Sequence, residues 1–439
     1  MEELARESIS LLAKPSLDTG SPNLSSFGAV FIMLKSALGA GLLNFPWAFN
    51  KAGGIHTAVS VELVSLIFLI SGLVILGYAS SISKQTTYQG VVKQVCGPAI
   101  GKLCEICFVF NLFMISVAFL RVAEDQLEKL CDSFYMNGTS EDTDYPHHWY
   151  MDQRFSLSAV CLLVILPLSI PKEIGFQKYT SILGTLAACY LTVVVVLKYC
   201  LLKEHAIQEH RHMSSASSWA SMFSVIPTIC FGFQCHEASI AIYSSMQNKK
   251  LLHWVVVSII SMMFCLLIYT LTGLYGFLTF GDNVAADILM SYPGNDVVII
   301  IARLLFGVSI ITIYPIILLL GRSVLYDVWM NYKRRYRVIT EPYEKCVRIV
   351  LTILWILVTL IIAMFVPDIS EVISVIGGIS AFFIFIFPGL CLVCAMETEP
   401  VEPRKKYCFI AWGTISIFCG VFIFGQSTTI AVMEILNKF

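Results

Sequence analysis

Long apolar stretches separated by short polar segments form the main pattern along this chain. Eleven such stretches are centred near residues 39, 68, 112, 162, 189, 232, 266, 311, 356, 384 and 418. A helix that crosses the hydrocarbon core of a bilayer needs about 20 mostly apolar residues. The pattern therefore predicts an all-α membrane protein with eleven transmembrane helices over residues 27–439. Residues 1–26 are polar and carry no signal peptide, so we expect them to form a cytoplasmic tail.

Two of these stretches are interrupted by residues that disfavour a continuous helix. The first, over 27–49, is interrupted by Gly39-Ala40-Gly41, and the sixth, over 222–243, by Phe231-Gly232-Phe233. Each glycine costs a helix about 1 kcal/mol relative to alanine. A break within lipid also leaves backbone groups that protein or ligand must satisfy. Interruptions in corresponding positions of two halves indicate a transporter binding site.

The spacing of the interruptions predicts an internal repeat. The first and sixth stretches each begin a set of five helices, and a final helix follows. Because five is odd, the second set enters the membrane from the opposite side, which gives a 5+5 inverted repeat plus one. Half-helix N-termini near the midplane attract an anionic group, and exposed carbonyls attract a cation. A zwitterionic amino acid with a sodium ion fits both features.

Composition supports the membrane prediction, and the placement of charges predicts the orientation. Hydrophobic residues make up 57% of the chain and charged residues 13%, whereas soluble domains have about 25% charged residues. Cytoplasmic loops are enriched in lysine and arginine. The basic residues gather on the side of the N-terminus, so we expect that end inside and the C-terminus outside. They are Lys249, Lys250, Lys333, Arg334, Arg335, Arg337, Lys345, Arg404, Lys405 and Lys406.

A glycosylation sequon agrees with this orientation. Asn137-Gly138-Thr139 lies in a polar segment of about 126–153, which the charge pattern places outside the cell. We therefore predict a glycan on Asn137. A second sequon at Asn23 falls on the cytoplasmic side, and we interpret it as a chance match.

The fifteen cysteines do not suggest a disulfide framework, because most lie inside apolar stretches, where a thiol packs as a small hydrophobe. Cys104-x-x-Cys107 and Cys391-x-x-Cys394 have redox or metal-ligand spacing. Neither has other ligand types nearby in the sequence, so we favour packing roles. Cys131 lies in the predicted outer loop and is either unpaired or bonded to a cysteine at a helix end such as Cys200.

Three motifs resemble a known family. They are SALGAGLLNFP at 36–46, PTICFGFQCH at 227–236, and Tyr314-Pro315 followed by Gly321-Arg322-Ser323. Together they resemble the sodium-coupled neutral amino acid transporters of solute carrier family 38, in the amino acid/auxin permease superfamily. The resemblance extends from about residue 26 to the end. It implies a LeuT-like fold, sodium-coupled uptake, and neutral amino acids such as glutamine as substrates.

The resemblance also implies the residues of the site. It places the substrate carboxylate at the glycines of the first helix and the opposite wall at the interruption of the sixth. It places a sodium ion between the first and eighth helices. The implied substrate-binding residues are Leu38, Gly39, Ala40, Gly41, Phe231, Gly232 and Phe233, and the implied sodium ligands are Ser309 and Thr312.

Four ionisable residues are candidates for coupling ion movement to substrate movement, since charges within a membrane are costly unless they have a function. Lys35 stands where several family members have asparagine, and its ammonium either enters the ion site or reaches the cytoplasmic interface. For Glu62 we favour bracing of the sixth helix over direct ion binding. His236 either senses pH or bonds to a backbone carbonyl. Glu237 either carries a proton or forms a structural pair.

Sodium-coupled transport of neutral amino acids is therefore the leading hypothesis. The alternatives are proton-coupled transport and an amino acid sensor that signals to cytoplasmic partners. We expect no enzyme activity, because no loop carries a nucleophile–base set or a metal-ligand cluster. We expect no cofactor, no metal beyond sodium and no nucleic acid, and we expect a monomer in the lipid bilayer. The plasma membrane is the expected location, with the lysosome as the alternative.

Overall fold

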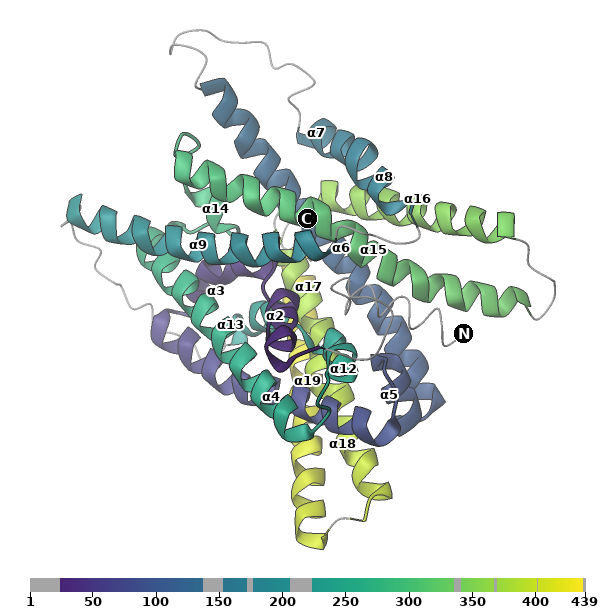
Figure 1. The fold of residues 1–439 in the computed structure, drawn as a ribbon. Coiled ribbons are helices and arrows are strands. Elements are labelled where there is room, and N and C mark those ends of the chain that lie inside the picture. The colour runs from purple at the N-terminus through teal and green to yellow at the C-terminus, as the bar shows by residue number, and fades with distance from the viewer. Residues whose placement is uncertain are drawn as a thin grey trace.

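The protein is entirely helical in the part that the structure describes. The structure is a computed structural model, and it describes residues 24–136, 153–171, 177–205, 223–334, 341–366, 369–400 and 402–436 (Figure 1). The helices up to the sixth apolar stretch are α2 (Ser26–Ala37), η1 (Ala40–Asn44), α3 (Phe45–Lys51), α4 (Ile55–Ser83), α5 (Tyr88–Cys96), α6 (Pro98–Met136), α7 (Gln153–Val160), η3 (Cys161–Ile165), α8 (Leu166–Ser169), α9 (Gln177–His205), α11 (Ile226–Gly232) and α12 (His236–Ser245).

The remaining helices follow the sixth apolar stretch. They are α13 (Leu251–Phe280), η4 (Gly281–Asn283), α14 (Ile288–Ser291), α15 (Val297–Arg334), α16 (Glu341–Phe365), α17 (Ile369–Ala381), η5 (Phe382–Ile386), α18 (Phe387–Thr398) and α19 (Pro403–Leu436).

Most of the predicted membrane helices are present. Within the described residues, eight helices are long and apolar enough to cross a membrane, and the bent pair Ser26–Ala37 and Ala40–Lys51 makes a ninth candidate. These candidates include nine of the eleven predicted centres. The other two centres, near 162 and 232, fall in shorter helices. The structure thus confirms an all-helical membrane protein, whereas the count of eleven stays a prediction.

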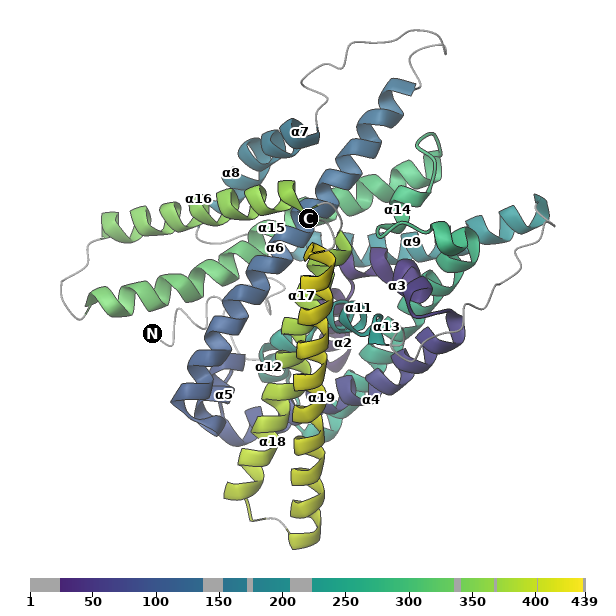
Figure 2. The same ribbon diagram turned by 180° about the vertical axis from the view of Figure 1, so that it is seen from behind.

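Burial separates a central helix from peripheral ones. In the candidate span Ile369–Thr398, 78% of the most apolar window is buried, against 22% in Pro403–Met433 and 28% in Pro342–Phe365. Figure 2 shows the first of these, as α17, running through the middle of the molecule beside α11. Large apolar side chains are exposed on the peripheral helices, including Val350 and Phe418. A lipid environment accounts for such exposure, because hydrocarbon tails solvate apolar side chains.

The central part of the molecule is built around the two interrupted segments. Helix α2 packs against α12 and α13, and α11 packs against α17 and η1. The long helix α6 packs against α15, α16 and α17. These contacts bring together the two interrupted segments, which lie about 190 residues apart in the chain.

The predicted outer loop is shorter than the sequence suggested. Helix α6 continues to Met136, so residues 126–136 of the predicted loop are helical. Asn137 lies outside the described residues, as do Arg335 and Arg337. No disulfide joins any of the described cysteines, so the bond that we considered between Cys131 and Cys200 is not formed.

Candidate functional site

The first interruption separates α2 from η1 and α3. The Ser25 side chain accepts a hydrogen bond from Gly28 N (3.1 Å) and so caps the start of α2. The helix ends at Ala37, and both Leu38 and Gly39 have extended backbone angles. The axis then turns by 51°. The turn leaves Leu38 and Gly39 outside any helix, between α2 and η1.

The second interruption separates α11 from α12. Pro227 stands in the first turn of α11, where its missing N–H costs no hydrogen bond. The helix ends at Gly232, and Phe233 and Cys235 have non-helical backbone angles. Helix α12 begins at His236. Both interruptions therefore fall at the glycine-containing segments that the sequence indicated.

The two interruptions touch through their glycines. A Cβ atom added to Gly41 would lie 2.9 Å from Gly232 Cα and 3.3 Å from a ring carbon of Phe231. A Cβ atom added to Gly232 would lie 2.7 Å from a ring carbon of Phe45. Gly41 is favoured because the two backbones approach closely, and Gly232 is favoured because the Phe45 ring fills the space that a Cβ would need.

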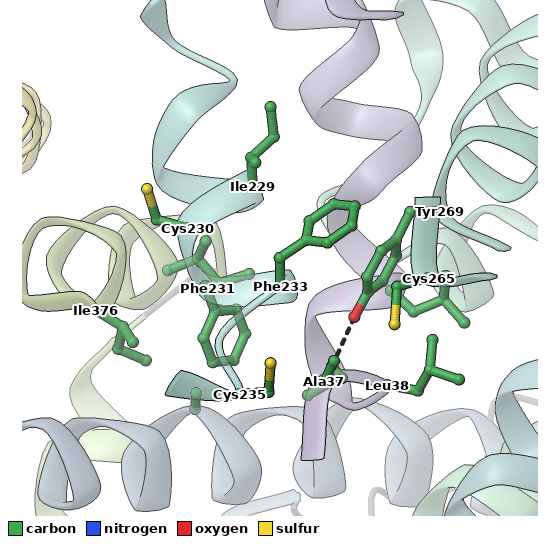
Figure 3. Packing of buried hydrophobic residues seen from close by; sticks show 14 of the residues in the cluster. Ala37, Leu38, Ile229, Cys230, Phe231, Phe233, Cys235, Cys265, Tyr269 and Ile376 are labelled. Atoms are coloured by element: carbon green, nitrogen blue, oxygen red, sulfur yellow. Dashed lines mark hydrogen bonds between the residues drawn. The ribbon is translucent and has the colours of Figure 1, made fainter. Parts of the chain in front are cut away.

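Tyr269 of α13 joins the ends of both interrupted helices. Its hydroxyl lies 2.7 Å from Ala37 O at the end of α2 and 2.7 Å from Gly232 O at the end of α11. Figure 3 shows the first of these hydrogen bonds, with the ring standing beside Phe233. One hydroxyl proton is shared between two carbonyls that the interruptions leave without helical partners. Sequence reasoning did not identify Tyr269.

An aromatic cluster packs on one side of the interruptions. The rings of Phe45 and Tyr269 are stacked with centroids 4.2 Å apart, and the Phe233 and Tyr269 centroids lie 4.8 Å apart. All three side chains are buried. We predicted one role for Phe231 and Phe233 together, but the structure separates them. Phe231 lines the central cavity, whereas Phe233 belongs to this cluster.

A cavity of about 160 Å³ lies on the other side of the interruptions. It is smaller than the roughly 300–1,000 Å³ of sites for drug-sized ligands, which suits a small solute. Its walls come from the first interruption, α6, the second interruption and α15. The lining residues are Lys35, Ser36, Ala37, Leu38, Gly39, Ala40, Gly41, Phe108, Leu112, Ile115, Phe119, Phe231, Gln234, Glu237, Ala238, Ile313, Ile316, Ile317 and Leu320.

Few polar side chains face this cavity. Glu237 accepts a hydrogen bond from Asn111 Nδ2 (2.8 Å), which satisfies one of its carboxylate oxygens. Gln234 accepts one from Ser380 Oγ (2.6 Å), and its side chain also interacts with the Glu237 carboxylate. Its Nε2 makes no hydrogen bond of good geometry to an acceptor among the described residues. The ammonium of Lys35 forms no ion pair within the described part of the chain. The cavity therefore offers an amide donor, a carboxylate and an unpaired ammonium in an apolar wall.

Two predicted coupling residues lie outside the cavity lining. His236 is buried with Nε2 3.0 Å from Leu69 O, which matches the backbone hydrogen bond that we considered. Glu62 is also buried, and its Oε2 accepts a hydrogen bond from Thr270 Oγ1 (2.8 Å). Because Thr270 belongs to α13, this bond links Glu62 to that helix and not to the second interruption.

The implied sodium ligands also lie away from the cavity lining. Four apolar residues form the α15 wall of the cavity: Ile313, Ile316, Ile317 and Leu320. Ser309 instead faces α9, since a Cβ atom on Gly184 would lie 3.2 Å from Ser309 Oγ. Thr312 Oγ1 donates to the carbonyls of its own helix, at 2.7 Å to Val308 O and 2.9 Å to Ser309 O. These two hydroxyls are not among the cavity-lining residues that include Gly39 and Gly41.

Asn44 connects the first interruption to the loop around α14. Its Nδ2 donates to Ala286 O (2.8 Å), and its Oδ1 accepts from Thr228 Oγ1 of α11 (2.9 Å). The loop is anchored further by Arg303, which donates to Leu289 O and Tyr292 O, both at 2.9 Å. Residue Asn44 thus ties both interrupted segments to a loop on the side opposite Lys35.

A second, larger cavity lacks the features of this site. About 890 Å³ of space lies between α6, α15 and α16, lined by apolar side chains apart from Lys102 and Glu105. It contains no residue of either interruption. Of these two cavities among the described residues, the smaller central one is lined by both interruptions and by polar side chains.

Comparison with known proteins identifies the family. The family model for transmembrane amino acid transporter protein matches residues 22–433. This chain belongs to that family. The family consists of transporters, not enzymes, so the expectation of no enzyme activity is confirmed.

Full-length relatives carry sodium-coupled transporter names. A Xenopus tropicalis protein numbered 8 among the sodium-coupled neutral amino acid transporters is 71% identical over 100% of both chains. Human solute carrier family 38 member 8 is 61% identical over 99% of this chain and 100% of its own length. Sodium-coupled neutral amino acid transporter 7 of Danio rerio is 44% identical over 99% of this chain and 95% of its own. The resemblance to solute carrier family 38 is therefore confirmed, with greater similarity to relatives numbered 8 than to this relative numbered 7.

A solved structure shares the fold. The crystal structure of MhsT in complex with L-phenylalanine covers 93% of this chain and 100% of its own, with a TM-score of 0.59 at 15% identity. MhsT is a LeuT-like structure, so this transporter has a LeuT-like structural neighbour. At this identity the likeness concerns the fold alone.

Proposed function

We propose that this chain is a secondary active transporter that carries neutral amino acids such as glutamine together with sodium by alternating access. The observation that carries the proposal is the contact between the two interruptions beside a small cavity. Membership in an amino acid transporter family and the sodium-coupled names of the relatives support it. In this proposal α2–α3 and α11–α12 are the broken first and sixth helices of a LeuT-like 5+5 inverted repeat plus one.

The substrate fits the cavity by its two charged groups. Its carboxylate would approach the backbone of Gly39 and Gly41, where open space lies in front of Gly39. Its polar side chain would meet Gln234 Nε2, a buried donor that makes no hydrogen bond of good geometry among the described residues. A buried unpaired donor costs about 1–3 kcal/mol, so a substrate amide oxygen bound there is favoured over an apolar group.

The closed side of the cavity suits one end of an alternating-access cycle. Phe45, Phe233 and Tyr269 pack together on the α3 side of the interruptions, and Asn44 bonds to the α14 loop there. We infer that these contacts close the α3 side of the cavity. Lys35 lines the opposite end. With a cytoplasmic N-terminus, this arrangement is closed to the outside.

Proton coupling is the second candidate because of one specific observation. Lys35 and Glu237 both line the cavity, and the Lys35 ammonium has no ion pair within the described residues. An ammonium cannot ligate sodium, and it can supply a positive charge in place of the ion. In that version sodium would not drive transport.

A current measurement separates the two candidates. Glutamine is applied to voltage-clamped cells that express the protein, first with sodium and then with choline at constant pH, and afterwards at varied pH. Sodium symport predicts an inward current that disappears in choline. A current that persists in choline and grows as external pH falls contradicts sodium symport and supports proton coupling.

Location and assembly complete the proposal. We expect a monomer in the plasma membrane with the N-terminus inside, the C-terminus outside and a glycan on Asn137. Enzymatic deglycosylation should increase gel mobility of the wild type and leave Asn137→Gln unchanged. Immunostaining without permeabilisation should detect a C-terminal tag and not an N-terminal one. Staining restricted to lysosomes would contradict the expected location.

A further inference from the structure

Cysteines from distant parts of the chain meet where α5 and α18 pack together. Cys96 Sγ, at the end of α5, lies 3.7 Å from Cys391 Sγ of α18. Cys394, one turn further along α18, also hydrogen-bonds to Cys96. A fourth thiol, Cys104 of α6, interacts electrostatically with Cys96 and Cys391. We favoured packing for Cys391 and Cys394 because no other ligand types lie nearby in the sequence, and their spacing could not indicate a partner 295 residues away.

The exposure of these thiols suits a reaction with a small oxidant. Cys391 is buried, whereas Cys96 and Cys394 are half-buried. Cys96 is the last residue of α5 and precedes Gly97, whose φ of 94° turns the chain into α6. Cys96 is therefore the partly exposed member of the close pair, and Cys391 is the buried one.

The hydrogen bond favours the reactive form of Cys96. The side-chain interaction with the Cys391 thiol, whose Sγ lies 3.7 Å from that of Cys96, lowers the pKa of Cys96 from its ordinary value, against the opposing effect of burial. The thiolate is the nucleophile in thiol oxidation. A half-buried thiol with a lowered pKa beside a second thiol is the arrangement of a redox-sensing pair.

We propose that Cys96 is an oxidation site at which a hydroperoxide such as hydrogen peroxide forms a disulfide between α5 and α18. The Cys96 thiolate attacks one peroxide oxygen, the O–O bond breaks, and with one proton the products are a sulfenic acid and water. The Cys391 or Cys394 thiol then attacks the Cys96 sulfur, the S–O bond breaks, and a second water leaves as the disulfide forms. Two thiols are oxidised and one peroxide is reduced. The sulfurs need to approach by only about 1.7 Å to reach bonding distance.

A metal site explains this cysteine cluster less well than an oxidation site does. Within the part of the chain that the structure describes, no three His, Cys, Asp or Glu side chains are arranged to hold a metal ion. The cluster also lies on the side that the charge pattern predicts to be cytoplasmic, where disulfides are mostly transient and redox-sensing.

The disulfide would restrain the interrupted segment. Helix α5 packs against α4, α6, α12 and α18, and α12 is the second half of the proposed sixth helix. A covalent link from α5 to α18 would hinder movement of α12 during the transport cycle. This consequence rests on the proposed function, whereas formation of the disulfide does not.

Peptide mapping tests the site directly. Purified full-length protein is treated with hydrogen peroxide, alkylated and digested, and the tryptic peptide 94–102, which contains only Cys96, is followed by mass spectrometry. We expect this peptide to be linked to one containing Cys391 or Cys394, and dithiothreitol should release it. Cys96→Ser should abolish the link, whereas Cys346→Ser, which changes an exposed cysteine elsewhere, should not. Unmodified Cys96 after Cys346 and Cys408 have reacted would overturn the proposal.

A transport assay on the same samples tests the consequence. Peroxide should lower glutamine uptake about threefold or more in the wild type, because it slows a conformational step. Dithiothreitol should restore uptake, and Cys96→Ser should not respond. A complete cross-link with unchanged uptake would overturn the regulatory role. If wild-type protein takes up no amino acid, the proposed function fails, and peptide mapping still decides whether the disulfide forms.

Discussion

Tyr269 is the residue on which both interruptions depend. The Tyr269→Phe variant keeps the stacking on Phe45 but leaves Ala37 O and Gly232 O without their shared donor. A buried unpaired carbonyl costs about 1–3 kcal/mol, so we expect a lower Tm and roughly tenfold weaker glutamine uptake.

A second buried tyrosine is the control. Tyr314 has its hydroxyl 2.7 Å from Thr359 Oγ1, and Thr359 also bonds to its own helix. The Tyr314→Phe variant should therefore lose less activity. Tm and uptake are measured for both variants at equal expression. Equal losses would mean that the Tyr269 hydroxyl contributes no more than that of another buried tyrosine.

The two glycines of the first interruption should differ in their tolerance of alanine. Gly39 has no heavy atom within 4 Å of an added Cβ, whereas an added Cβ at Gly41 would lie 2.9 Å from Gly232 Cα. Overpacking costs about 1–3 kcal/mol, so Gly41→Ala should lower both Tm and uptake. Gly39→Ala should keep its Tm and raise the glutamine concentration for half-maximal uptake, because the methyl group would enter the proposed carboxylate site.

The Gly39→Ala and Gly41→Ala variants also test whether the substrate binds at this backbone. Thermal unfolding and concentration-dependent uptake are measured for both variants. Wild-type glutamine affinity in a folded Gly39→Ala protein would mean that the substrate does not approach this backbone.

Lys35 should determine how strongly the transporter binds sodium. Its ammonium lines the cavity without an ion pair in the described residues. Repulsion between unit charges 4 Å apart is about 4 kcal/mol at an effective dielectric of 20, and 1.4 kcal/mol is tenfold in affinity. The Lys35→Asn variant should therefore show at least about tenfold higher apparent sodium affinity in glutamine-evoked currents.

A surface lysine provides the comparison for Lys35. Lys51 lies at the other end of the same interrupted segment, over the ring of Trp47. The Lys51→Asn variant should leave the sodium dependence unchanged. Superimposable sodium curves for wild type and Lys35→Asn would show that Lys35 does not act on the ion.

Sequence reasoning could locate these residues only in part. Gly39, Gly41 and Gly232 were predictable because glycine within an apolar helix marks an interruption. Tyr269 was not, since a tyrosine in an apolar helix resembles ordinary packing and its partners lie 232 and 37 residues away. Ser309 and Thr312 were inferred from resemblance alone and stay a prediction, and the α15 residues that line the cavity are apolar.

Among the elements, α14 depends on a buried carboxyl group at its start. Asp287 Oδ1 accepts from Leu289 N (2.8 Å), and Oδ2 accepts from Gln126 Nε2 (2.6 Å). Burial raises the pKa of Asp287 to about 7 from its ordinary 3.8, although the hydrogen bond from Leu289 and the charges of Arg303 and Arg121 favour the ionised form. The neighbouring carboxyl group of Asp125 also faces it.

This raised pKa predicts a pH dependence of stability. A carboxyl group with a raised pKa in the folded state stabilises it below the unfolded pKa, near pH 4, and that stabilisation is lost as pH rises through about 7. The Tm should therefore fall by about 1–3 °C between pH 6 and pH 8. Asp287→Asn should flatten this slope, and Asp282→Asn, which changes an exposed carboxyl group in the same loop, should not. A steeper slope for Asp287→Asn would contradict the assignment.

The elements themselves were largely predictable from hydropathy. A long apolar run can be recognised from the local sequence alone. Nine of the eleven predicted centres accordingly lie in helices with the length and apolarity of a membrane span. The region near 162 was harder, because Cys161–Ile165 is a π-helical turn inside a short helix. The extension of α6 to Met136 was missed because polar residues 126–136 resemble a loop in a hydropathy pattern.

At the scale of the whole molecule, family membership shows an amino acid transporter, and the two interrupted segments lie around one cavity. The alternating-access cycle is our proposal for how they work. The contact between Gly41 and Gly232 and the Asn44 hydrogen bonds join elements from both proposed repeats. Such long-range contacts could not be derived from local patterns, although the resemblance implied that the two segments face each other. In the proposed function, this arrangement converts a sodium gradient into an amino acid gradient.

Concentrative uptake into proteoliposomes tests that claim most directly. Purified protein is reconstituted, an inward sodium gradient is imposed at equal pH on both sides, and internal labelled glutamine is measured over time. Sodium-driven symport predicts that internal glutamine rises above the external concentration and returns to it when a sodium ionophore is added. Accumulation that ignores the sodium gradient and follows an imposed proton gradient, or equilibration without accumulation, would contradict it.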